Sequence, residues 1–159
     1  PLLVLEAKLK LVHLYVKRIV PLQDFFVGPF QTILDPQEIV LEVQIPKPPP
    51  YSSGSYQYIH KASSVGETLV GAAAFLVMDP KDSICEDIRI SLSSVAPTPI
   101  RAKASERILK GKRLEEKTIK EAVQMASDET QPRSRPFYRR EMSRVMVERA
   151  IFQAMEKIR

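Results

Sequence analysis

The sequence predicts an α+β protein: a three-stranded antiparallel sheet with helices packed on one face. Strand patterns fill the chain up to about residue 95, and helix patterns follow them. Ile88, Ile90 and Leu92 alternate with polar residues, which is the period of two typical of a strand with one buried and one wetter face. Residues 119–126 instead carry apolar side chains at the spacing of an amphipathic helix. Strands first and helices afterwards are typical of this fold class.

The first 45 residues read as a run of short strands. Residues 38–45 (EIVLEVQI) alternate most clearly between apolar and polar side chains. The proline-rich stretch 46–50 ends that strand, because proline fixes the backbone and donates no ladder hydrogen bond. We therefore divide the chain into residues 1–46, a linker at 47–53 and a small domain at 54–159. Because the chain starts inside an apolar run without methionine, we expect a segment of a longer or processed protein.

The small domain begins with strand patterns at residues 55–62, 68–78 and 84–95, joined by short loops. Successive strands with short connections most simply form an antiparallel meander. A helix is expected to follow at once, with Thr98 as its cap and Pro99 at its first position. Its apolar side chains would cover the last strand, and they recur every four residues, at Ile100, Ala104 and Ile108. Gly111 supplies the stop.

The last helix is predicted from Phe137 onward and carries a loose basic series. The series comprises Arg133, Arg135, Arg139, Arg140, Arg144 and Arg149. One interpretation places these arginines on nucleic-acid phosphates with Tyr138 stacking on a base. The other pairs them with glutamates of the same helix or with an acidic partner subunit. The absence of any nucleic-acid-binding motif favours the second interpretation.

Composition excludes several classes of site. The chain has 159 residues, a formal net charge of +5 and a single cysteine, Cys85, so it forms no internal disulfide or multi-thiolate metal site. A reducing cytoplasm fits this cysteine usage. His13 and His60 lack metal-ligand spacing, and the five glycines are scattered and form no nucleotide-binding fingerprint. The sequence therefore predicts no catalytic and no metal-binding residues of its own.

Three stretches resemble one family, the flavin-binding subunits of molybdenum hydroxylases related to carbon monoxide dehydrogenase and xanthine dehydrogenase. Residues 91–112 (SLSSVAPTPIRAKASERILKGK) are similar to the C-terminal domain of those subunits. Residues 17–46 (KRIVPLQDFFVGPFQTILDPQEIVLEVQIP) resemble the strand-rich end of their larger FAD-binding domain. Tyr138, Arg139 and Arg140 begin a stretch like the family's "YRR.M" helix.

The resemblance implies the C-terminal portion of an FAD-binding electron-transfer subunit. Such a subunit relays electrons between [2Fe–2S] clusters and an external acceptor. The clusters and the molybdopterin site would lie on partner iron–sulfur and molybdenum subunits. The family's glycine-rich and "SP..D" loops have no counterpart in this chain, so its FAD pocket is expected to be incomplete. No nucleic-acid partner is expected, because glutamates interrupt the arginines of the last helix, and no membrane span is expected, because no apolar run approaches the roughly 20 residues needed. The cysteine usage leads us to expect a cytoplasmic location.

By ungapped matching to the family, Val40 and Tyr58 fall at flavin-contacting positions. We expect a subunit interface at Tyr138, Arg139 and Arg140, where the two arginines would meet carboxylates or backbone carbonyls of this chain or of a partner subunit. Tyr58 stands where a lysine is usual and Gly66 where an aspartate is usual. A tyrosine stacks on a ring or donates a hydrogen bond, but it carries no permanent positive charge. The competing hypothesis is therefore a non-catalytic interaction or assembly module that keeps this fold without bound FAD.

Overall fold

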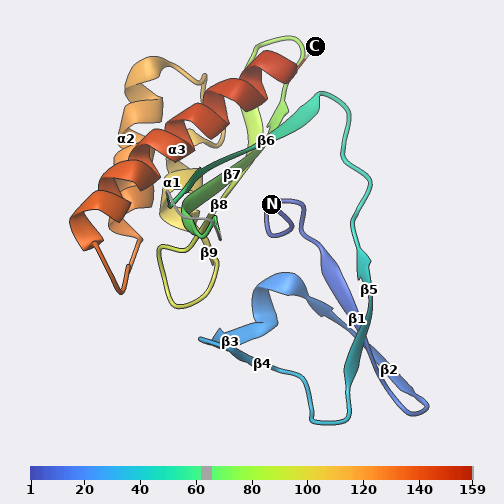
Figure 1. Ribbon diagram of the computed structural model, residues 1–159. Helices are drawn as coiled ribbons and strands as arrows, with labels where there is room; N and C mark the ends of the chain where they lie inside the picture. Colours follow the sequence, from blue (N-terminus) through green and yellow to red (C-terminus); the bar gives the residue numbers. More distant parts are fainter. Residues whose placement is uncertain (62–65, 159) are drawn as a thin grey trace.

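The computed structural model describes residues 1–61 and 66–158. These residues form a four-stranded, a three-stranded and a two-stranded sheet, and a layer of helices covers the four-stranded sheet (Figure 1). The first part contains β1 (Lys8–His13), β2 (Val16–Pro21), the 3-10 helix η1 (Leu22–Asp24), β3 (Phe26–Gly28), β4 (Gln31–Thr32) and β5 (Ile39–Gln44). The second part contains β6 (Ser52–His60), β7 (Thr68–Met78), β8 (Cys85–Ser93), β9 (Ile100–Arg101), α1 (Lys103–Leu109), α2 (Glu116–Asp128) and α3 (Pro136–Lys157).

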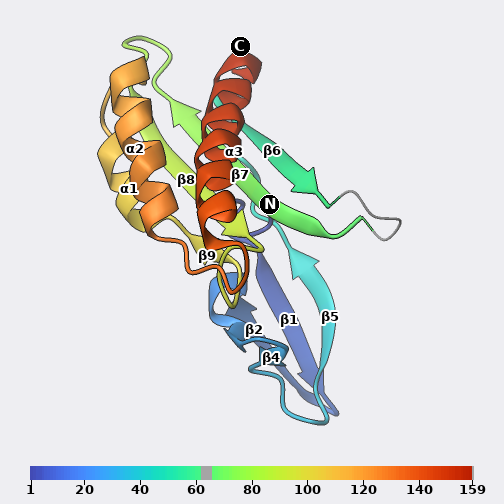
Figure 2. The same ribbon diagram turned by 60° about the vertical axis from the view of Figure 1, so that its left-hand side comes forward.

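The predicted α+β class is confirmed, and the helices α1, α2 and α3 lie on one face of the larger sheet (Figure 2). Within the described residues that sheet is antiparallel with the order β6-β7-β8-β9, so the prediction of three strands is wrong by one. The extra strand, β9, pairs Ile100 with Leu92 and Arg101 with Ser91. Ser94 adopts a positive φ of 64°, and the chain then turns back along β8 in extended form.

The helix expected from Thr98 begins instead at Lys103, because residues 100 and 101 belong to β9. Ala102 precedes the helix without a side-chain cap. The backbone amides of Ala104 and Ser105 both donate to Oε1 of Glu129, at 3.2 Å each. A carboxylate from the end of α2 thus does what we expected of a local hydroxyl.

The predicted core face of β8 is confirmed. Ile88, Ile90 and Leu92 are 2%, 0% and 1% exposed. They belong to the main core, to which the three helices contribute buried side chains that include Leu109, Ile119, Ala122, Val123, Met146, Val147, Ala150 and Ile151.

The opposite face of β8 is less exposed to solvent than predicted, because the first residues of the chain pack across the sheet. Val4 and Leu5 form a second cluster with Ala73, Phe75 and Val77 of β7. On β8, the guanidinium of Arg89 lies 4.7 Å from the centre of the Phe75 ring and donates to the carbonyl oxygen of Val4 at 3.1 Å. Ser91 is only 5% exposed.

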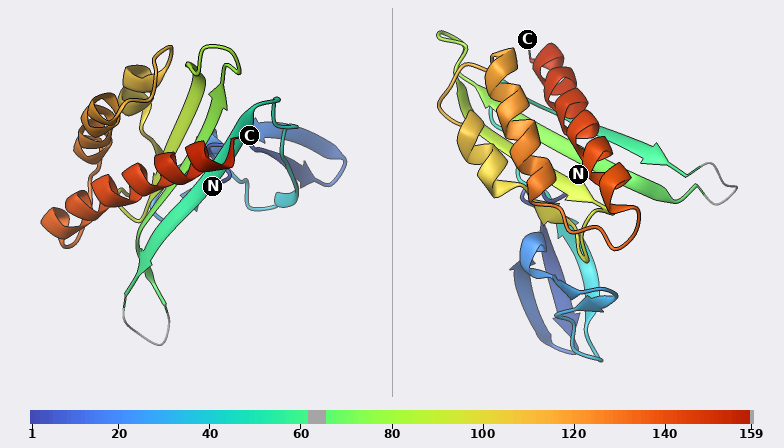
Figure 3. Two further views of the ribbon diagram at one scale, coloured as in Figure 1. Left: turned by 90° about the horizontal axis from the view of Figure 1, so that it is seen from above. Right: turned by 90° about the vertical axis from the view of Figure 1, so that its left-hand side faces the viewer.

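The smaller sheet has the order β2-β1-β5 and carries its own core. Leu9 and Leu11 of β1 are buried against Leu3, Ala7, Leu22 and Phe25. Strand β5 lies at its edge, and Ile39, Val40, Leu41, Val43 and Ile45 along and just after it are 40% to 62% exposed. Figure 3 shows this sheet beside one end of the larger one, with the helices on the far side.

Candidate functional site

Three aromatic rings form a ladder on the face of β6 that is turned away from α3. Tyr56, Tyr58 and His60 occupy alternate positions of the strand, so their side chains share that face. The ring centres of Tyr56 and Tyr58 are 5.4 Å apart, and those of Tyr58 and His60 are 4.5 Å apart. Ser55, which precedes the ladder, points the other way, and its hydroxyl donates to the carbonyl of Ala150 on α3 at 2.8 Å. The close packing of α3 therefore fixes the direction of the ladder.

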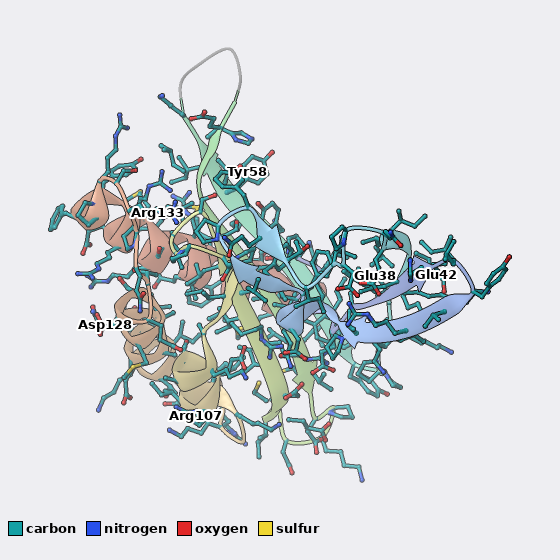
Figure 4. The ribbon with its side chains drawn as sticks, turned by 90° about the horizontal axis from the view of Figure 1, so that it is seen from below. Glu38, Glu42, Tyr58, Arg107, Asp128 and Arg133 are labelled. Atoms are coloured by element: carbon teal, nitrogen blue, oxygen red, sulfur yellow. The ribbon has the colours of Figure 1, made fainter. Side chains whose placement is uncertain are left out.

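Of the two tyrosines in the ladder, Tyr58 has the more exposed side chain and is therefore the more accessible to a ligand. Its side chain is half exposed, and Figure 4 shows it pointing outward from β6. Beside it, Nδ1 of His60 lies 3.5 Å from the Thr68 hydroxyl of β7. A half-exposed phenol ring supported by neighbouring rings is suited to stacking against a planar ligand.

Tyr56 lies across Gly71, at a groove between the two parts of the chain. A β-carbon added to Gly71 would stand 2.6 Å from the Tyr56 hydroxyl and 2.5 Å from Oγ of Ser93, so only glycine admits this packing. The groove is about 170 Å³ in volume and mostly apolar. Its other wall comes from the first residues of the chain together with Leu22 and Phe26.

The fit to FAD is partial. The ladder and the apolar groove suit a planar ring, and the Gly71 contact keeps Tyr56 flat against the sheet. The diphosphate needs a cluster of backbone amides, usually from a glycine-rich loop. Only Gly66 and Gly71 of the five glycines lie within five residues of one another. These residues therefore fit the ring of the cofactor, whereas its diphosphate would need donors from elsewhere.

Val40 lies in β5 and pairs with Leu11 of β1, so it belongs to the smaller sheet, whereas Tyr58 belongs to the larger one. Val40 is 40% exposed. Flavin contact at Val40 and Tyr58 stays a prediction.

Arg139 holds α3 to the sheet. It donates to the carbonyl of Leu69 at 2.9 Å and also to the carbonyl of Ser94. Arg140 has an exposed side chain, and its backbone carbonyl accepts the Ser127 hydroxyl at 3.0 Å. Tyr138 is 40% exposed. The structure thus gives Arg139 a role within the chain, while a subunit interface at Tyr138, Arg139 and Arg140 stays a prediction.

Other reactive groups offer little chemistry. Burial, followed by the nearby Asp87 carboxylate, raises the pKa of the Cys85 thiol to about 12, so the thiolate is scarce at neutral pH. Within residues 1–61 and 66–158, no three His, Cys, Asp or Glu side chains are grouped to hold a metal ion. None of the described helices has the length and apolar composition needed to cross a bilayer.

Sequence reasoning found Tyr58 but missed Tyr56, Gly71 and His60, which lie beside it. The alternation of rings in YQYIH was the available signal, since alternate residues of a strand share a face. The contact with Gly71 had no signal in the sequence, because it depends on the register of β6 against β7, which sets Tyr58 opposite Gly71.

Two protein families together match most of the chain. "CO dehydrogenase flavoprotein C-terminal domain" matches residues 57–154. "FAD binding domain in molybdopterin dehydrogenase" matches residues 1–48. The predicted domain boundaries at 47–53 stay a prediction.

Curated relatives agree with these matches. The carbon monoxide dehydrogenase medium chain of Afipia carboxidovorans is 31% identical over 86% of this chain and 48% of its own length. The putative xanthine dehydrogenase FAD-binding subunit of Escherichia coli is 26% identical over 84% of this chain and 46% of its own. The chain thus spans about half the length of these relatives.

Solved structures match closely in fold. Carbon monoxide dehydrogenase from Hydrogenophaga pseudoflava, in a form that lacks the molybdopyranopterin moiety, superposes with a TM-score of 0.91 at 27% identity. The match covers 99% of this chain and 55% of that one. The cyanide-inactivated copper–molybdenum carbon monoxide dehydrogenase superposes with a TM-score of 0.88 at 29% identity, covering 96% of this chain and 54% of that one.

Proposed function

We propose an electron-transfer role for this chain, which belongs to the family of FAD-binding medium subunits of carbon monoxide dehydrogenase and xanthine dehydrogenase type molybdenum hydroxylases, and corresponds to their C-terminal part. In this proposal the subunit relays electrons between [2Fe–2S] clusters of a partner and an external acceptor. FAD, when bound, supplies one- and two-electron transfer. The observation that carries the proposal is the aromatic ladder and groove, which lie where the FAD-binding part meets the C-terminal domain.

The chain's own residues would bind and orient the ring of the cofactor. Tyr58 would stack on the ring or donate a hydrogen bond from its hydroxyl, and Val40 would border the ring with apolar surface. The ring of Tyr56 would pack against Tyr58 and hold it in place. The groove beside Gly71 would exclude water from one edge of the cofactor's ring. Because a tyrosine side chain carries no permanent positive charge, Tyr58 would stabilise a reduced, negatively charged ring less than a lysine does.

A non-catalytic assembly module is the second candidate. The scattered glycines favour it, because the sequence contains no glycine-rich stretch of the kind that binds a diphosphate. In this alternative the ladder would contact protein in place of a flavin.

The proposed partners rest on the same family, and the proposed location rests on the cysteine usage of the sequence. Relatives named medium chains belong to multi-subunit dehydrogenases. We therefore propose that an iron–sulfur subunit and a molybdenum subunit associate with this chain, and that the complex is cytoplasmic. We propose no nucleic-acid partner and no membrane span.

The experiment is a flavin titration on the complex that contains this chain, with two matched variants. Tyr58→Ala removes the exposed rung of the ladder, and Tyr51→Ala removes a tyrosine of nearly equal exposure, 52% against 50%, outside it. We expect Tyr58→Ala to lower FAD occupancy and to shift the flavin absorption band, and Tyr51→Ala to leave both unchanged. A wild-type complex without flavin would instead support the assembly module.

A further inference from the structure

A short basic segment lies at and just after α1. The segment from Lys103 to Arg113 carries one acidic residue, Glu106, and five basic residues. The basic residues, which we call the basic α1 face, are Lys103, Arg107, Lys110, Lys112 and Arg113, and all of them are exposed. Five basic residues and one acidic residue give this short segment a net charge of +4.

Glu106 does not neutralise the basic α1 face, because its carboxylate points toward the sheet. Its Oε1 accepts the backbone amide of Ile90 at 2.8 Å and Nε of Arg101 at 2.7 Å, and its side chain is only 14% exposed. Two further carboxylates lie close to the segment. Glu129 accepts the backbone amides of Ala104 and Ser105. Asp87 pairs with Lys110 at 2.9 Å, but Lys110 keeps 59% of its side chain exposed. Such exposed pairs contribute little and leave the cation accessible.

The backbone that presents these charges is held in place. At its start, Glu129 accepts the first amides of α1. After the helix, the amide of Gly111 donates to the carbonyl of Cys85 at 2.7 Å, and the amide of Cys85 donates to the carbonyl of Lys112 at 2.9 Å. Arg113 then forms an isolated bridge with Ile84. A partner would therefore meet charges whose backbone is already ordered, which lowers the entropy cost of binding.

The basic α1 face is separate from the ladder. Figure 4 shows Arg107 on α1 well away from Tyr58 on β6, and α1 lies in the helix layer on the other face of the sheet (Figure 3). A partner bound there would leave the groove open. The segment from Lys103 to Arg113 contains no aromatic residue, so it offers nothing for base stacking.

We propose that the basic α1 face docks an acidic surface of another subunit of the same complex. The proposal rests on the proposed function for the existence of that complex, and on charge complementarity for the choice of partner. Because the face is charged and rigid, the contact would depend on ionic strength and act mainly on the rate of association.

The test compares two double charge reversals in the complex that contains this chain. The variant Lys103→Glu with Arg107→Glu reverses two charges of the basic α1 face. The variant Arg133→Glu with Arg149→Glu makes the same change in charge just before α3 and within it. We expect the first variant to slow reassociation with the partner subunits by about tenfold or more at low salt. The α3 variant and added salt serve as references: the α3 variant should reassociate like the wild type, and salt should slow the wild type toward the α1 variant.

Flavin content is measured in every sample, so that a failure of the electron-transfer proposal can be distinguished from a failure of the docking proposal. A complex without flavin that still depends on the basic α1 face would contradict electron transfer but support docking. Unchanged reassociation of the α1 variant would overturn the docking proposal, whatever the flavin content. If the reversal prevents folding, as judged by circular dichroism, Lys103→Gln with Arg107→Gln takes its place.

A separate experiment measures the binding of a fluorescent DNA of about 20 base pairs to the wild type and the variants at two salt concentrations. Tight, salt-sensitive DNA binding that is lost in the α1 variant, with subunit association intact, would assign the face to nucleic acid and overturn the proposal. Weak DNA binding that does not differ between the variants would support it.

Discussion

Gly71 decides how Tyr56 lies on the sheet, because any side chain at this position would occupy the space of its ring. We expect Gly71→Ala to destabilise the fold by about 1–3 kcal/mol, the usual cost of overpacking a close contact. Its β-carbon would meet Oγ of Ser93 at 2.5 Å and the Tyr56 hydroxyl at 2.6 Å. Urea unfolding measures the loss. Adding Ser93→Ala should restore part of the stability, and no recovery in the double variant would contradict this account.

Glu38 makes stability depend on pH in the acid range. Hydrogen bonds from Arg18, at 2.6 and 2.7 Å, and from the Asp35 amide lower the pKa of Glu38 from 4.5 to about 2. The unfolded chain takes up this proton first, so the contribution of Glu38 is complete above about pH 4.5 and is lost as the pH falls toward 2.

Thermal melts of the wild type and Glu38→Gln between pH 6 and about pH 2 test this dependence. The difference in melting temperature should shrink as the pH falls through that window. Glu121→Gln, at an exposed glutamate of α2, provides the control. A difference that stays constant down to the lowest pH would show that the carboxylate of Glu38 is not the cause.

At the scale of elements, α1 depends on α2 for its start. The Oε1 atom of Glu129 accepts the amides of Ala104 and Ser105, and Ala102 provides no cap of its own. We expect Glu129→Ala to cost about 0.5–2 kcal/mol, as the loss of a helix cap usually does. Asp128→Ala is the control, because the exposed Asp128 side chain (Figure 4) accepts a hydrogen bond from Gln124 of its own helix at 3.0 Å and not from α1. Equal losses in urea unfolding would show that the cap contributes nothing.

At the scale of the whole molecule, the 159-residue chain is expected to bind FAD poorly by itself. It offers ring contacts at Tyr56 and Tyr58 but lacks a glycine-rich site for the diphosphate. Quenching of flavin fluorescence by the purified chain measures the affinity, and lumiflavin, which has no diphosphate, serves as the matched ligand. Similar weak affinities for FAD and lumiflavin would support the prediction. Submicromolar FAD binding would contradict it.

The sequence by itself determined the local elements and the buried face of β8. The alternation of Ile88, Ile90 and Leu92, and the helical spacing from Ile119, both report on which side of an element is apolar. A period is a property of neighbouring residues, so it can be read without knowing what packs against them. The resemblance of residues 17–46 and 91–112 to one family extended this reading to the class of protein.

Only the tertiary structure decided the contacts between segments distant in the chain. Strand β9 exists because residues 100 and 101 return along β8, and α1 starts late because Glu129 reaches it from α2. The first residues of the chain cover the face of the larger sheet opposite the helices. The side chain of Ser91 on that face was expected to be exposed to solvent, and it is buried. The ladder meets Gly71 through the register of β6 and β7. Each of these contacts joins residues far apart in sequence, and their energies depend on distances that local propensity does not encode.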